Sequence, residues 1–240
     1  IIANRVGHAY LFNGGRGTGK TTSAKVLARA INCLNPKDGE PCNECEICKA
    51  ALSGSLTDIV EMDAASNNSV EDIRSIRDEV NFLPTLAKYR VYIIDEVHML
   101  STGAFNALLK TLEEPPAHVK FILATTEPQK LPATILSRCQ RFDFKKISPE
   151  NIVKRLQIVC KSSNIVADEN ALKIIASLSE GAMRDALSIL ERCLQDGDNE
   201  ISEDKVKELV GIPKLNFIED IVESIINKDV DKCLTTLKTV

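Results

Sequence analysis

Four of the eight cysteines in this 240-residue chain fall within residues 33–48, in the pattern C-x8-C-x2-C-x2-C. Four thiolates with two C-x2-C steps are a ligand set for tetrahedral Zn²⁺ in a closed structural site. An iron–sulfur cluster is the rival, because C-x2-C-x2-C also begins the ferredoxin-type run. That run continues with a cysteine and a proline, where this chain has Leu52 and Ser53. The spacing favours zinc, and the predicted ligands are Cys33, Cys42, Cys45 and Cys48.

The segment that carries these cysteines has little apolar material with which to fold alone. Its sequence NPKDGEPCNE is rich in Asn, Pro, Gly and charge. We expect a metal to hold it together as a surface projection for partner contacts, since metal ligation supplies folding free energy to small modules. A closed four-thiolate site leaves no position for a reacting water, so this zinc is predicted to be structural.

The segment GGRGTGKT, residues 14–21, fits the phosphate-binding pattern G-x-x-x-x-G-K-[ST]. An expected strand, AYLFN, precedes it and an expected helix, KTTSAKVLARAI, follows it, which is the context that the motif requires. Lys20 would place its charge at the outer phosphates of a nucleoside triphosphate, and Thr21 would ligate Mg²⁺. The predicted nucleotide-binding residues of this loop are Gly14, Gly15, Arg16, Gly17, Thr18, Gly19, Lys20, Thr21 and Thr22.

A second acidic motif, VYIIDE, completes the predicted nucleotide site. Four apolar residues carry Asp95 to the carboxyl end of a strand, where parallel α/β sheets bind their ligands. We expect Asp95 to hold Mg²⁺ through water and Glu96 to orient or deprotonate the attacking water. The following His98 makes DEVH similar to helicase motifs, but packing or support of neighbouring groups is the favoured interpretation for a lone histidine.

A third strand, KFILATT, ends in two threonines at the expected edge of the pocket. Thr126 is predicted to hydrogen-bond the γ-phosphate or the attacking water. The alternative is that it caps a helix or a turn.

The elements that must position these residues alternate between strands and helices over residues 1–147. Expected strands are AYLFN (9–13), DIVEMD (58–63), VYIID (91–95), KFILATT (120–126) and RFDFKK (141–146). Expected helices are KTTSAKVLARAI, VEDIRSIRDEVNFL and GAFNALLKTLEE. This pattern predicts an α/β domain with a parallel sheet. Residues 148–211 read as a small all-α domain that begins at Ser148-Pro149, and residues 212–240 read as the start of a third, helical domain.

The composition is that of an ordinary globular protein, with 44% hydrophobic and 27% charged residues. No apolar run approaches 18 residues, so no membrane span and no membrane partner are expected. The net charge of −4 excludes a protein that grips nucleic acid over its whole surface, and DNA contact would need a local basic patch or a groove between subunits. The chain begins without Met and its helical pattern stops at Val240, so we expect a piece of a longer protein.

Four segments occur in order along the chain: GGRGTGKT, VYIIDEVHML, LATTEPQKLP and TILSRCQRF. With them the chain resembles the AAA-plus ATPases. More narrowly, it resembles the gamma/tau family of bacterial DNA polymerase III clamp-loader subunits, because HAYLF, the four-cysteine insertion, NALLKTLEEPP and SRC occur together. The resemblance runs from about His8 to Val240. It implies a P-loop ATPase domain with a zinc-binding insertion, a helical lid and the beginning of a helical collar.

The resemblance assigns roles to two arginines. Arg138 matches the arginine of the family's SRC motif, which enters the ATP site of the next subunit; such a finger contributes about 10³–10⁵ in rate. From the sequence alone, Arg138 could equally be a surface ion-pair residue. The segment GAMRD, residues 181–185, matches the sensor-2 motif, which implies that Arg184 contacts the γ-phosphate within its own subunit.

The implied function is that of a motor subunit of the DNA polymerase III holoenzyme, a DNA-directed DNA polymerase complex. It would hydrolyse ATP with Mg²⁺ and load the beta sliding clamp onto primer–template DNA. The implied partners are delta, delta-prime and further gamma/tau copies in a hetero-pentameric ring, in the bacterial cytoplasm at the nucleoid-associated replisome. Relative to a whole family member, the chain lacks part of the adenine pocket before Ile1 and most of the collar, so weak ATP binding and poor assembly are expected.

Two alternatives stand beside this function. DEVH suggests a DNA helicase or branch-migration motor, although helicase DNA-contact motifs are not found. The other is a non-hydrolysing structural clamp-loader subunit that only presents SRC to its neighbour. The intact Lys20, Thr21, Asp95 and Glu96 argue against that second alternative.

Overall fold

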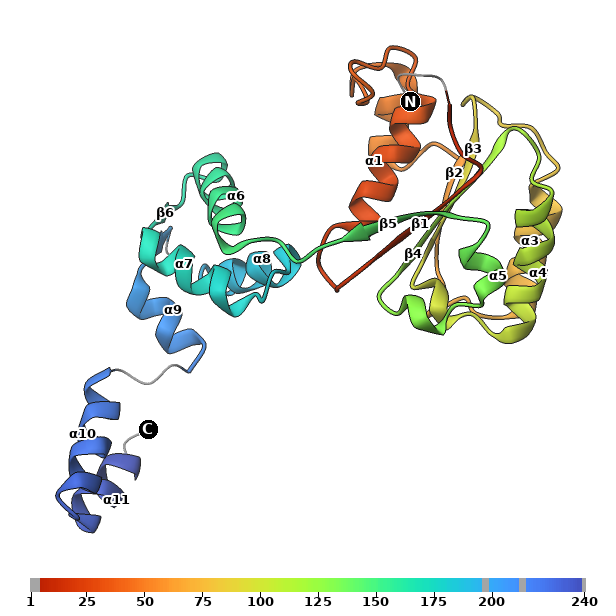
Figure 1. Cartoon of the computed structure of the whole chain (residues 1–240). Helices are drawn as coiled ribbons and strands as arrows, with labels where there is room; N and C mark the ends of the chain where they lie inside the picture. Colours follow the sequence, from red (N-terminus) through yellow and green to blue (C-terminus); the bar gives the residue numbers. More distant parts are fainter. Residues whose placement is uncertain (1–4, 196–198, 212–214, 239–240) are drawn as a thin grey trace. The chain divides into compact units, whose positions relative to one another are not determined.

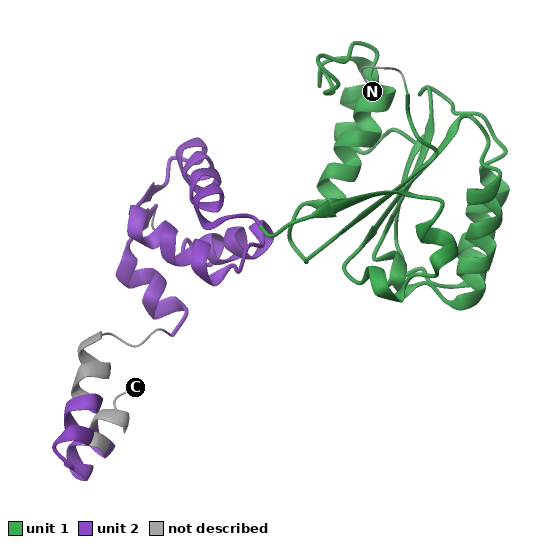
Figure 2. Ribbon diagram, viewed as in Figure 1, with its two compact units in different colours: residues 1–146 green, residues 147–240 purple. Residues whose placement is uncertain are grey.

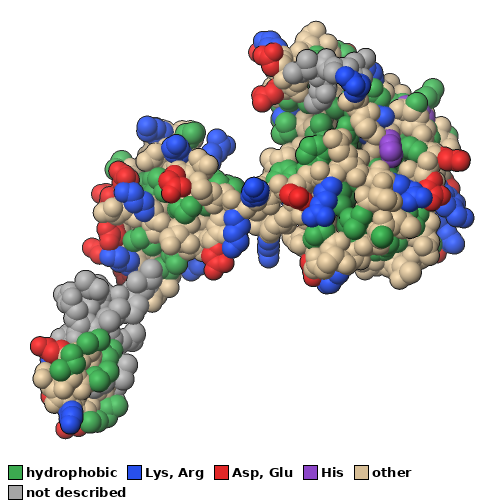
Figure 3. Space-filling model, viewed as in Figure 1, with side chains coloured by type: hydrophobic (Ala, Val, Ile, Leu, Met, Phe, Trp, Pro, Cys, Tyr) green, Lys and Arg blue, Asp and Glu red, His purple; other side chains and the backbone are tan. Residues whose placement is uncertain are grey.

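The computed structural model describes residues 5–195, 199–211 and 215–238. The chain divides into two compact units, residues 1–146 and 147–240 (Figure 2). The predicted start of a collar domain at residue 212 lies outside the described residues. Charged side chains of both signs are scattered over the visible face in Figure 3.

No helix in the described part of the chain is long and apolar enough to cross a membrane.

The first unit is built on a five-stranded sheet in the order β2-β3-β4-β1-β5, in which every pairing is parallel. Its strands are β1 (Ala9–Gly14), β2 (Ile59–Asp63), β3 (Arg90–Asp95), β4 (Val119–Thr125) and β5 (Gln140–Phe144). Its helices are α1 (Lys20–Asn32), α2 (Glu46–Ser53), α3 (Val70–Glu79), α4 (Thr102–Glu113) and α5 (Ala133–Leu136), with short 3-10 turns η1 (Val97–Met99) and η2 (Pro128–Lys130). This arrangement confirms the predicted α/β fold class with a parallel sheet.

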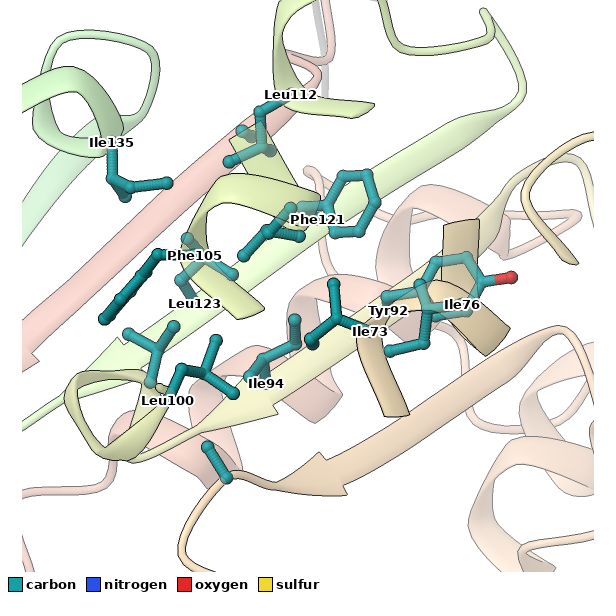
Figure 4. Packing of buried hydrophobic residues seen from close by; sticks show 14 of the residues in the cluster. Ile73, Ile76, Tyr92, Ile94, Leu100, Phe105, Leu112, Phe121, Leu123 and Ile135 are labelled. Atoms are coloured by element: carbon teal, nitrogen blue, oxygen red, sulfur yellow. The ribbon is translucent and has the colours of Figure 1, made fainter. Parts of the chain in front are cut away.

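Alternate side chains of the strands face opposite sides of the sheet, and each side is covered by its own helices (Figure 1). On one side, Phe12 and Ile93 are buried in a cluster with Ala28 of α1. On the other side, the cluster contains residues of α3, α4 and α5, and Figure 4 shows part of it: Ile73, Ile76, Tyr92, Ile94, Leu100, Phe105, Leu112, Phe121, Leu123 and Ile135. Because β4 is buried along its whole length, the carboxyl ends of β1, β3 and β4 are fixed by the core.

Helix α3 ends at Glu79, whereas the sequence pattern predicts helix as far as Leu83. Pro84 disfavours helical backbone at Leu83. The segment that follows is held by a contact that no local pattern reveals. The buried Asp58 carboxylate accepts the backbone N–H groups of residues 85, 86 and 87 at 2.8–2.9 Å. As a result, Phe82 and Leu83 lie in an exposed loop, at 67% and 74% exposure.

The second unit is mainly helical, as predicted, and has its own buried core. Its helices are α6 (Pro149–Ser162), α7 (Glu169–Leu178), α8 (Met183–Arg192), α9 (Glu203–Leu209), α10 (Leu215–Ile226) and α11 (Val230–Lys238). The prediction of an all-α lid needs one correction, because two-residue strands β6 (Val166–Ala167) and β7 (Glu200–Ile201) pair in parallel. Strands this short carry no alternating pattern from which they could be predicted.

Candidate active site

The phosphate-binding loop joins the end of β1 to the start of α1. Gly14 has φ +152°, and a Cβ placed there would collide with the carbonyl oxygen of Phe144 on β5. Gly19 has φ +94°, a left-handed conformation that glycine adopts without strain. Helix α1 begins directly after it without a side-chain cap. The first N–H groups of this helix are therefore suited to bind an anion.

Lys20 lies inside this loop with only 5% of its surface exposed. Its Nζ donates hydrogen bonds to the carbonyl oxygens of Gly14 and Gly15, both at 2.9 Å. Burial lowers the pKa of Lys20, and the nearby charges of Glu96 and Asp95 oppose that shift. The ammonium group is thus held at the centre of the loop by backbone carbonyls.

The other predicted loop residues lie around Lys20. Thr18 is buried and donates its hydroxyl to the carbonyl oxygen of Gly15 at 2.8 Å. Gly17 is half-buried, with φ +71°. Arg16, within the loop, and Thr22, in the first turn of α1, are exposed.

Thr21 and Asp95, the two predicted Mg²⁺ residues, are brought together although they lie 74 residues apart in the sequence. The Thr21 hydroxyl donates to Asp95 Oδ2 at 2.6 Å, and the second carboxylate oxygen accepts the N–H of Glu96 at 2.9 Å. A hydroxyl and a carboxylate beside a phosphate-binding loop fit Mg²⁺, which prefers oxygen ligands and binds proteins through few of them.

Glu96 and Thr126 also meet at this edge of the sheet. Glu96 has φ 45° and ψ 43°, a left-handed conformation that turns the chain sharply after β3. Its Oε2 accepts the hydroxyl of Thr126 at 3.0 Å and the backbone N–H of Thr126 at 3.2 Å. His98 lies beside this pair with 6% of its side chain exposed. Five predicted residues, Lys20, Thr21, Asp95, Glu96 and Thr126, therefore belong to one site.

Arg138 is placed differently, after the short helix α5. Its guanidinium donates to the carbonyl oxygen of Thr134 at 2.9 Å, to the Ser137 hydroxyl at 3.3 Å and to Glu113 Oε1 at 2.8 Å. One third of the side chain is exposed. The contacts described for Arg138 thus hold it on α4 and α5, and they include none of the nucleotide-loop residues.

Arg184 lies in the first turn of α8 in the second unit and is exposed. Gly181, just before this helix, has φ +88°, so the GAMRD segment turns sharply into α8. Its predicted contact with a γ-phosphate remains a prediction.

The four clustered cysteines form a candidate metal centre at the other end of α1. Their Sγ atoms all lie within 4.8 Å of one another. Sulfur pairs Cys33–Cys42 and Cys42–Cys48 are 3.4 and 4.0 Å apart, and Cys33–Cys45 is also 4.0 Å. Zn–S bonds of about 2.3 Å in a tetrahedron imply sulfur–sulfur distances of about 3.8 Å. The geometry fits the predicted zinc ligands.

Local backbone structure presents these sulfurs. Cys33 ends α1, and Cys45 caps the N-terminus of α2. Between them, Asp38 and Gly39 have φ 51° and 87°, and residues 37 and 40 exchange two backbone hydrogen bonds. This is the tight hairpin turn that an Asp-Gly pair favours.

The pKa values of two thiols in the cluster are shifted in opposite directions. Backbone hydrogen bonds lower the pKa of Cys42 to about 6, whereas burial, followed by its neighbours' hydrogen bonds, raises the pKa of Cys48 to about 12. Four thiolates at these distances repel one another. A divalent cation among them offsets that repulsion, because metal binding displaces the thiol protons.

Comparisons with known proteins agree with this geometry. Residues 1–148 match the sequence model of a family described as "DNA polymerase III, delta subunit". Residues 151–199 match "DNA polymerase III clamp loader subunit, ATPase lid domain". The DNA polymerase III subunit tau of Bacillus subtilis is 50% identical over 237 residues, which cover 99% of this chain and 42% of that protein. The chain belongs to the gamma/tau family of DNA polymerase III clamp-loader subunits.

Other relatives support membership of the gamma/tau family. Subunit tau of Escherichia coli is 45% identical over 93% of this chain and 36% of its own length. Subunit gamma of Buchnera aphidicola from Acyrthosiphon pisum is 42% identical over 100% of this chain and 66% of its own length. The chain spans 42% and 34% of the relatives from Bacillus subtilis and Haemophilus influenzae.

Solved structures of Thermotoga maritima RuvB share the fold. The structure described as the Holliday junction branch migration motor is 20% identical, with a TM-score of 0.62 over 94% of this chain and 70% of that one. A second RuvB structure, that of a variant from the same organism, gives 19% identity and a TM-score of 0.64 with the same coverage. At about 20% identity, the likeness to RuvB shows the fold of this chain and does not show its activity.

The partners of two residues that the sequence singled out, Arg138 and His98, were not predicted. Glu113 is the ion-pair partner of Arg138, and Glu127 lies 3.2 Å from the Nε2 of His98. Both glutamates stand in segments that the sequence singles out, NALLKTLEEPP and LATTEPQKLP. Their partners lie 25 and 29 residues away along the chain, so no local spacing could identify them.

Proposed function

We propose that this chain is the ATP-binding and ATP-hydrolysing motor part of a bacterial clamp-loader subunit. The observation that carries the proposal is the contact between Thr21 and Asp95 at 2.6 Å, next to Lys20 in a glycine-lined loop. A hydroxyl, a carboxylate and a buried ammonium group meet where α1 begins. This is the set of groups that a nucleoside triphosphate and its cation require.

Substrate binding follows from the loop. Lys20 would exchange the carbonyl oxygens of Gly14 and Gly15 for phosphate oxygens of ATP, which carry more negative charge. Thr21 and Asp95 would hold Mg²⁺, which supplies positive charge at the phosphates. The loop N–H groups and the N-terminus of α1 would bind the remaining oxygens.

In hydrolysis, Glu96 would orient the attacking water. In the structure the Glu96 carboxylate accepts two hydrogen bonds from Thr126. To orient water, Glu96 would exchange the Thr126 hydroxyl for a water molecule, and that hydroxyl would then be free to contact the γ-phosphate. Within the same subunit, Arg184 of the lid would contact the γ-phosphate as well.

Arg138 would act on the nucleotide of the neighbouring subunit. Its guanidinium is held by Glu113 at 2.8 Å and would exchange this carboxylate for the phosphates across the interface. Entry of a planar cation at that point neutralises charge that develops in the transition state. Hydrolysis would then depend on assembly.

The proposed assembly rests on the family resemblance of the sequence, and the match of the lid to a clamp-loader subunit family supports it. We propose a hetero-pentameric ring of delta, delta-prime and gamma/tau subunits that opens the beta clamp and places it on primer–template DNA as part of the DNA polymerase III holoenzyme. This work would take place in the bacterial cytoplasm at the replisome. A branch-migration motor is disfavoured, because the RuvB likeness is near 20% identity, whereas relatives named tau and gamma reach 41–50%.

The closing test is ATP binding by the chain and ATP hydrolysis by the reconstituted loader with clamp and primed DNA. Lys20→Ala should abolish nucleotide binding, while Lys25→Ala, a matched exposed lysine paired with Glu61, should not.

Arg138→Ala should leave binding unchanged and lower hydrolysis by about 10³-fold or more. Arg141→Ala, a nearby arginine paired with Asp143, is its control. Full-rate hydrolysis by the isolated Arg138→Ala chain would refute action across the interface.

We also propose that Cys33, Cys42, Cys45 and Cys48 hold one structural Zn²⁺. The sulfur–sulfur distances support this assignment. Elemental analysis of the purified protein should give one zinc per chain. A brown protein with iron and acid-labile sulfide would show an iron–sulfur cluster instead.

A further inference from the structure

His98 occupies the 3-10 turn η1, directly after the two carboxylates at the end of β3. Its imidazole is almost fully buried, yet each ring nitrogen faces a polar atom. Nδ1 lies 3.0 Å from Thr125 Oγ1, and Nε2 lies 3.2 Å from Glu127 Oε2. Thr125 ends β4 and is fully buried. The ring therefore joins the ends of two neighbouring strands.

The hydrogen bonds around the ring form a closed circuit, in which each donor hydrogen makes one hydrogen bond. The Glu127 carboxylate only accepts, because it is also bound by Lys130 at 2.7 Å and its pKa is held below the ordinary value, first by that contact. Nε2 must therefore donate to Glu127. In a neutral ring Nδ1 then accepts the Thr125 hydroxyl hydrogen, and Thr125 Oγ1 accepts the backbone N–H of Glu127 at 3.0 Å.

This circuit fixes the segment that holds Glu96. Thr126 lies between Thr125 and Glu127, and its N–H and hydroxyl are the donors to Glu96 Oε2. His98 Nδ1 is 3.4 Å from the same oxygen, longer than its contact with Thr125. With the Nε2–H tautomer, the ring offers Glu96 no hydrogen. It acts on Glu96 through the Thr125–Glu127 segment.

We propose that His98, in its Nε2–H form, is a positioning residue that sets the position of the Glu96 carboxylate by fixing residues 125–127. The consequence for hydrolysis rests on the proposed function, whereas the tautomer does not. The competing view is that His98 only fills space between β3 and β4. The two views differ in which substitutions are tolerated, because hydrogen bonds and volume can be removed separately.

Substitutions separate the two roles. His98→Gln keeps a donor that can reach Glu127 and an acceptor for Thr125, whereas His98→Leu keeps volume and removes both. We expect His98→Leu to lower kcat of the reconstituted loader by about 10- to 100-fold, the range found when a residue that orients an active-site group through hydrogen bonds is lost, with KM and ATP affinity within about twofold. His98→Gln should recover most of that loss. Glu127→Gln should lower kcat in the same direction, and its effect should not add to that of His98→Leu.

His118 provides the matched control, since its Nε2 faces a single backbone carbonyl oxygen, that of Val80, at 3.0 Å. His118→Leu should leave kcat unchanged. Circular dichroism and thermal melting of every variant exclude unfolding as the cause. Equal kcat for His98→Leu and the unchanged protein, or a loss that His98→Gln does not recover, would overturn the proposal.

A second measurement is independent of ATP hydrolysis. The chain has three histidines, so long-range ¹H–¹⁵N spectra with single variants assign each ring. We expect His98 to carry its proton on Nε2 at pH 7.5, and a proton on Nδ1 would overturn the circuit. If the unmodified loader fails to hydrolyse ATP, the proposed function fails, and the tautomer still decides whether the circuit exists.

Discussion

The nucleotide loop (residues 14–21) and the cysteine module (residues 33–53) lie at opposite ends of the same helix, α1, and different kinds of contact hold them in place. The loop follows β1, five of whose six residues are buried, and it meets β3 and β4 at their fixed carboxyl ends. The module consists mainly of exposed residues, and its buried apolar residues within the described chain are Pro41, Ile47 and Cys48. The packed sheet thus positions the nucleotide loop, whereas the cysteine module has few buried side chains and would depend on its proposed Zn²⁺ for stability.

Because of this difference, the two sites should respond differently to the loss of a ligand. In the nucleotide site, the protein's own groups already satisfy one another: Lys20 with loop carbonyls, Thr21 with Asp95, and Glu96 with Thr126. In the module, the polar contacts of the cysteines are with one another and with nearby N–H groups. Loss of a ligand should therefore leave the first site intact and disorganise the second.

The largest expected effect comes from removing the metal. Chelation should remove a binding free energy of about 10–16 kcal/mol, the range for structural zinc in small peptides, and Cys45→Ser, which leaves three thiol ligands, should remove part of it. Hydrogen exchange should then show loss of protection over residues 33–53 with the sheet still protected, and ATP affinity should change little. Cys160→Ala, which removes a buried thiol of the second unit, should keep one zinc per chain. Unfolding of the sheet together with metal loss would contradict the contrast between the two sites.

A smaller effect is expected at Asp58, which holds a loop without any metal. Asp58→Asn removes the negative charge and replaces one of the two accepting oxygens with an NH2 donor, so three N–H groups are left with one neutral acceptor. It should lower the free energy of unfolding by about 2–4 kcal/mol, because hydrogen bonds to a charged group contribute about 1.5–3 kcal/mol each and are not additive. Urea denaturation measures it. Asp78→Asn, at an exposed carboxylate, should change stability by less than about 0.5 kcal/mol. An equal effect at both positions would show that Asp58 does not hold the loop.

The same carboxylate predicts a dependence on pH. Burial alone would raise the pKa of Asp58, but the N–H groups of residues 85–87 outweigh it and hold the pKa below its ordinary value. A lowered folded-state pKa means that the carboxylate stabilises the fold fully above the unfolded pKa of about 3.9, and that this stability is lost as the pH falls through the folded-state pKa. The stability difference between Asp58→Asn and the unchanged protein should therefore shrink in acid.

The smallest effect is expected at Ser69, which caps α3. Its hydroxyl accepts the N–H of Asp72 at 3.2 Å, and the Asp72 carboxylate accepts the N–H of Ser69 at 3.0 Å. Ser69→Ala should lower the free energy of unfolding by about 1 kcal/mol. Ser75→Ala, within the same helix, is the control and should be nearly neutral. A loss at Ser69 as large as that at Asp58 would mean that a local cap contributes as much as a buried long-range contact.

The sequence predicted those features of the sites that depend on residues close together in the chain. The glycines and Lys20 lie within one octapeptide, and four apolar residues before Asp95 identify a buried strand. The structure brings Thr21, Asp95, Glu96 and Thr126 together because strands β1, β3 and β4 end at the same edge of the parallel sheet. This follows once the strands are predicted to be parallel. The four sulfurs likewise meet as their spacing indicates.

Contacts between distant segments could not be predicted in this way. The end of α3 depends on Asp58, and the helical pattern of residues 80–83 carries no sign of it. Helix α2 was missed because its cap is Cys45, a residue that sequence reasoning reserved for metal. The proposed His98 circuit joins the ends of β3 and β4, which the sequence predicted, through long-range contacts and a tautomer that have no sequence pattern.

The pairing of Arg138 with Glu113 determines what can displace it. An incoming group must compete with a carboxylate that is already in place at 2.8 Å and belongs to the same molecule. A single surface carboxylate offers no advantage in that competition, whereas a triphosphate presents several oxygens to the fork of the guanidinium. If Arg138 acts across a subunit interface as proposed, it would remain paired with Glu113 when no nucleotide faces it, and a nucleotide with three phosphates would displace Glu113 more readily than one with two.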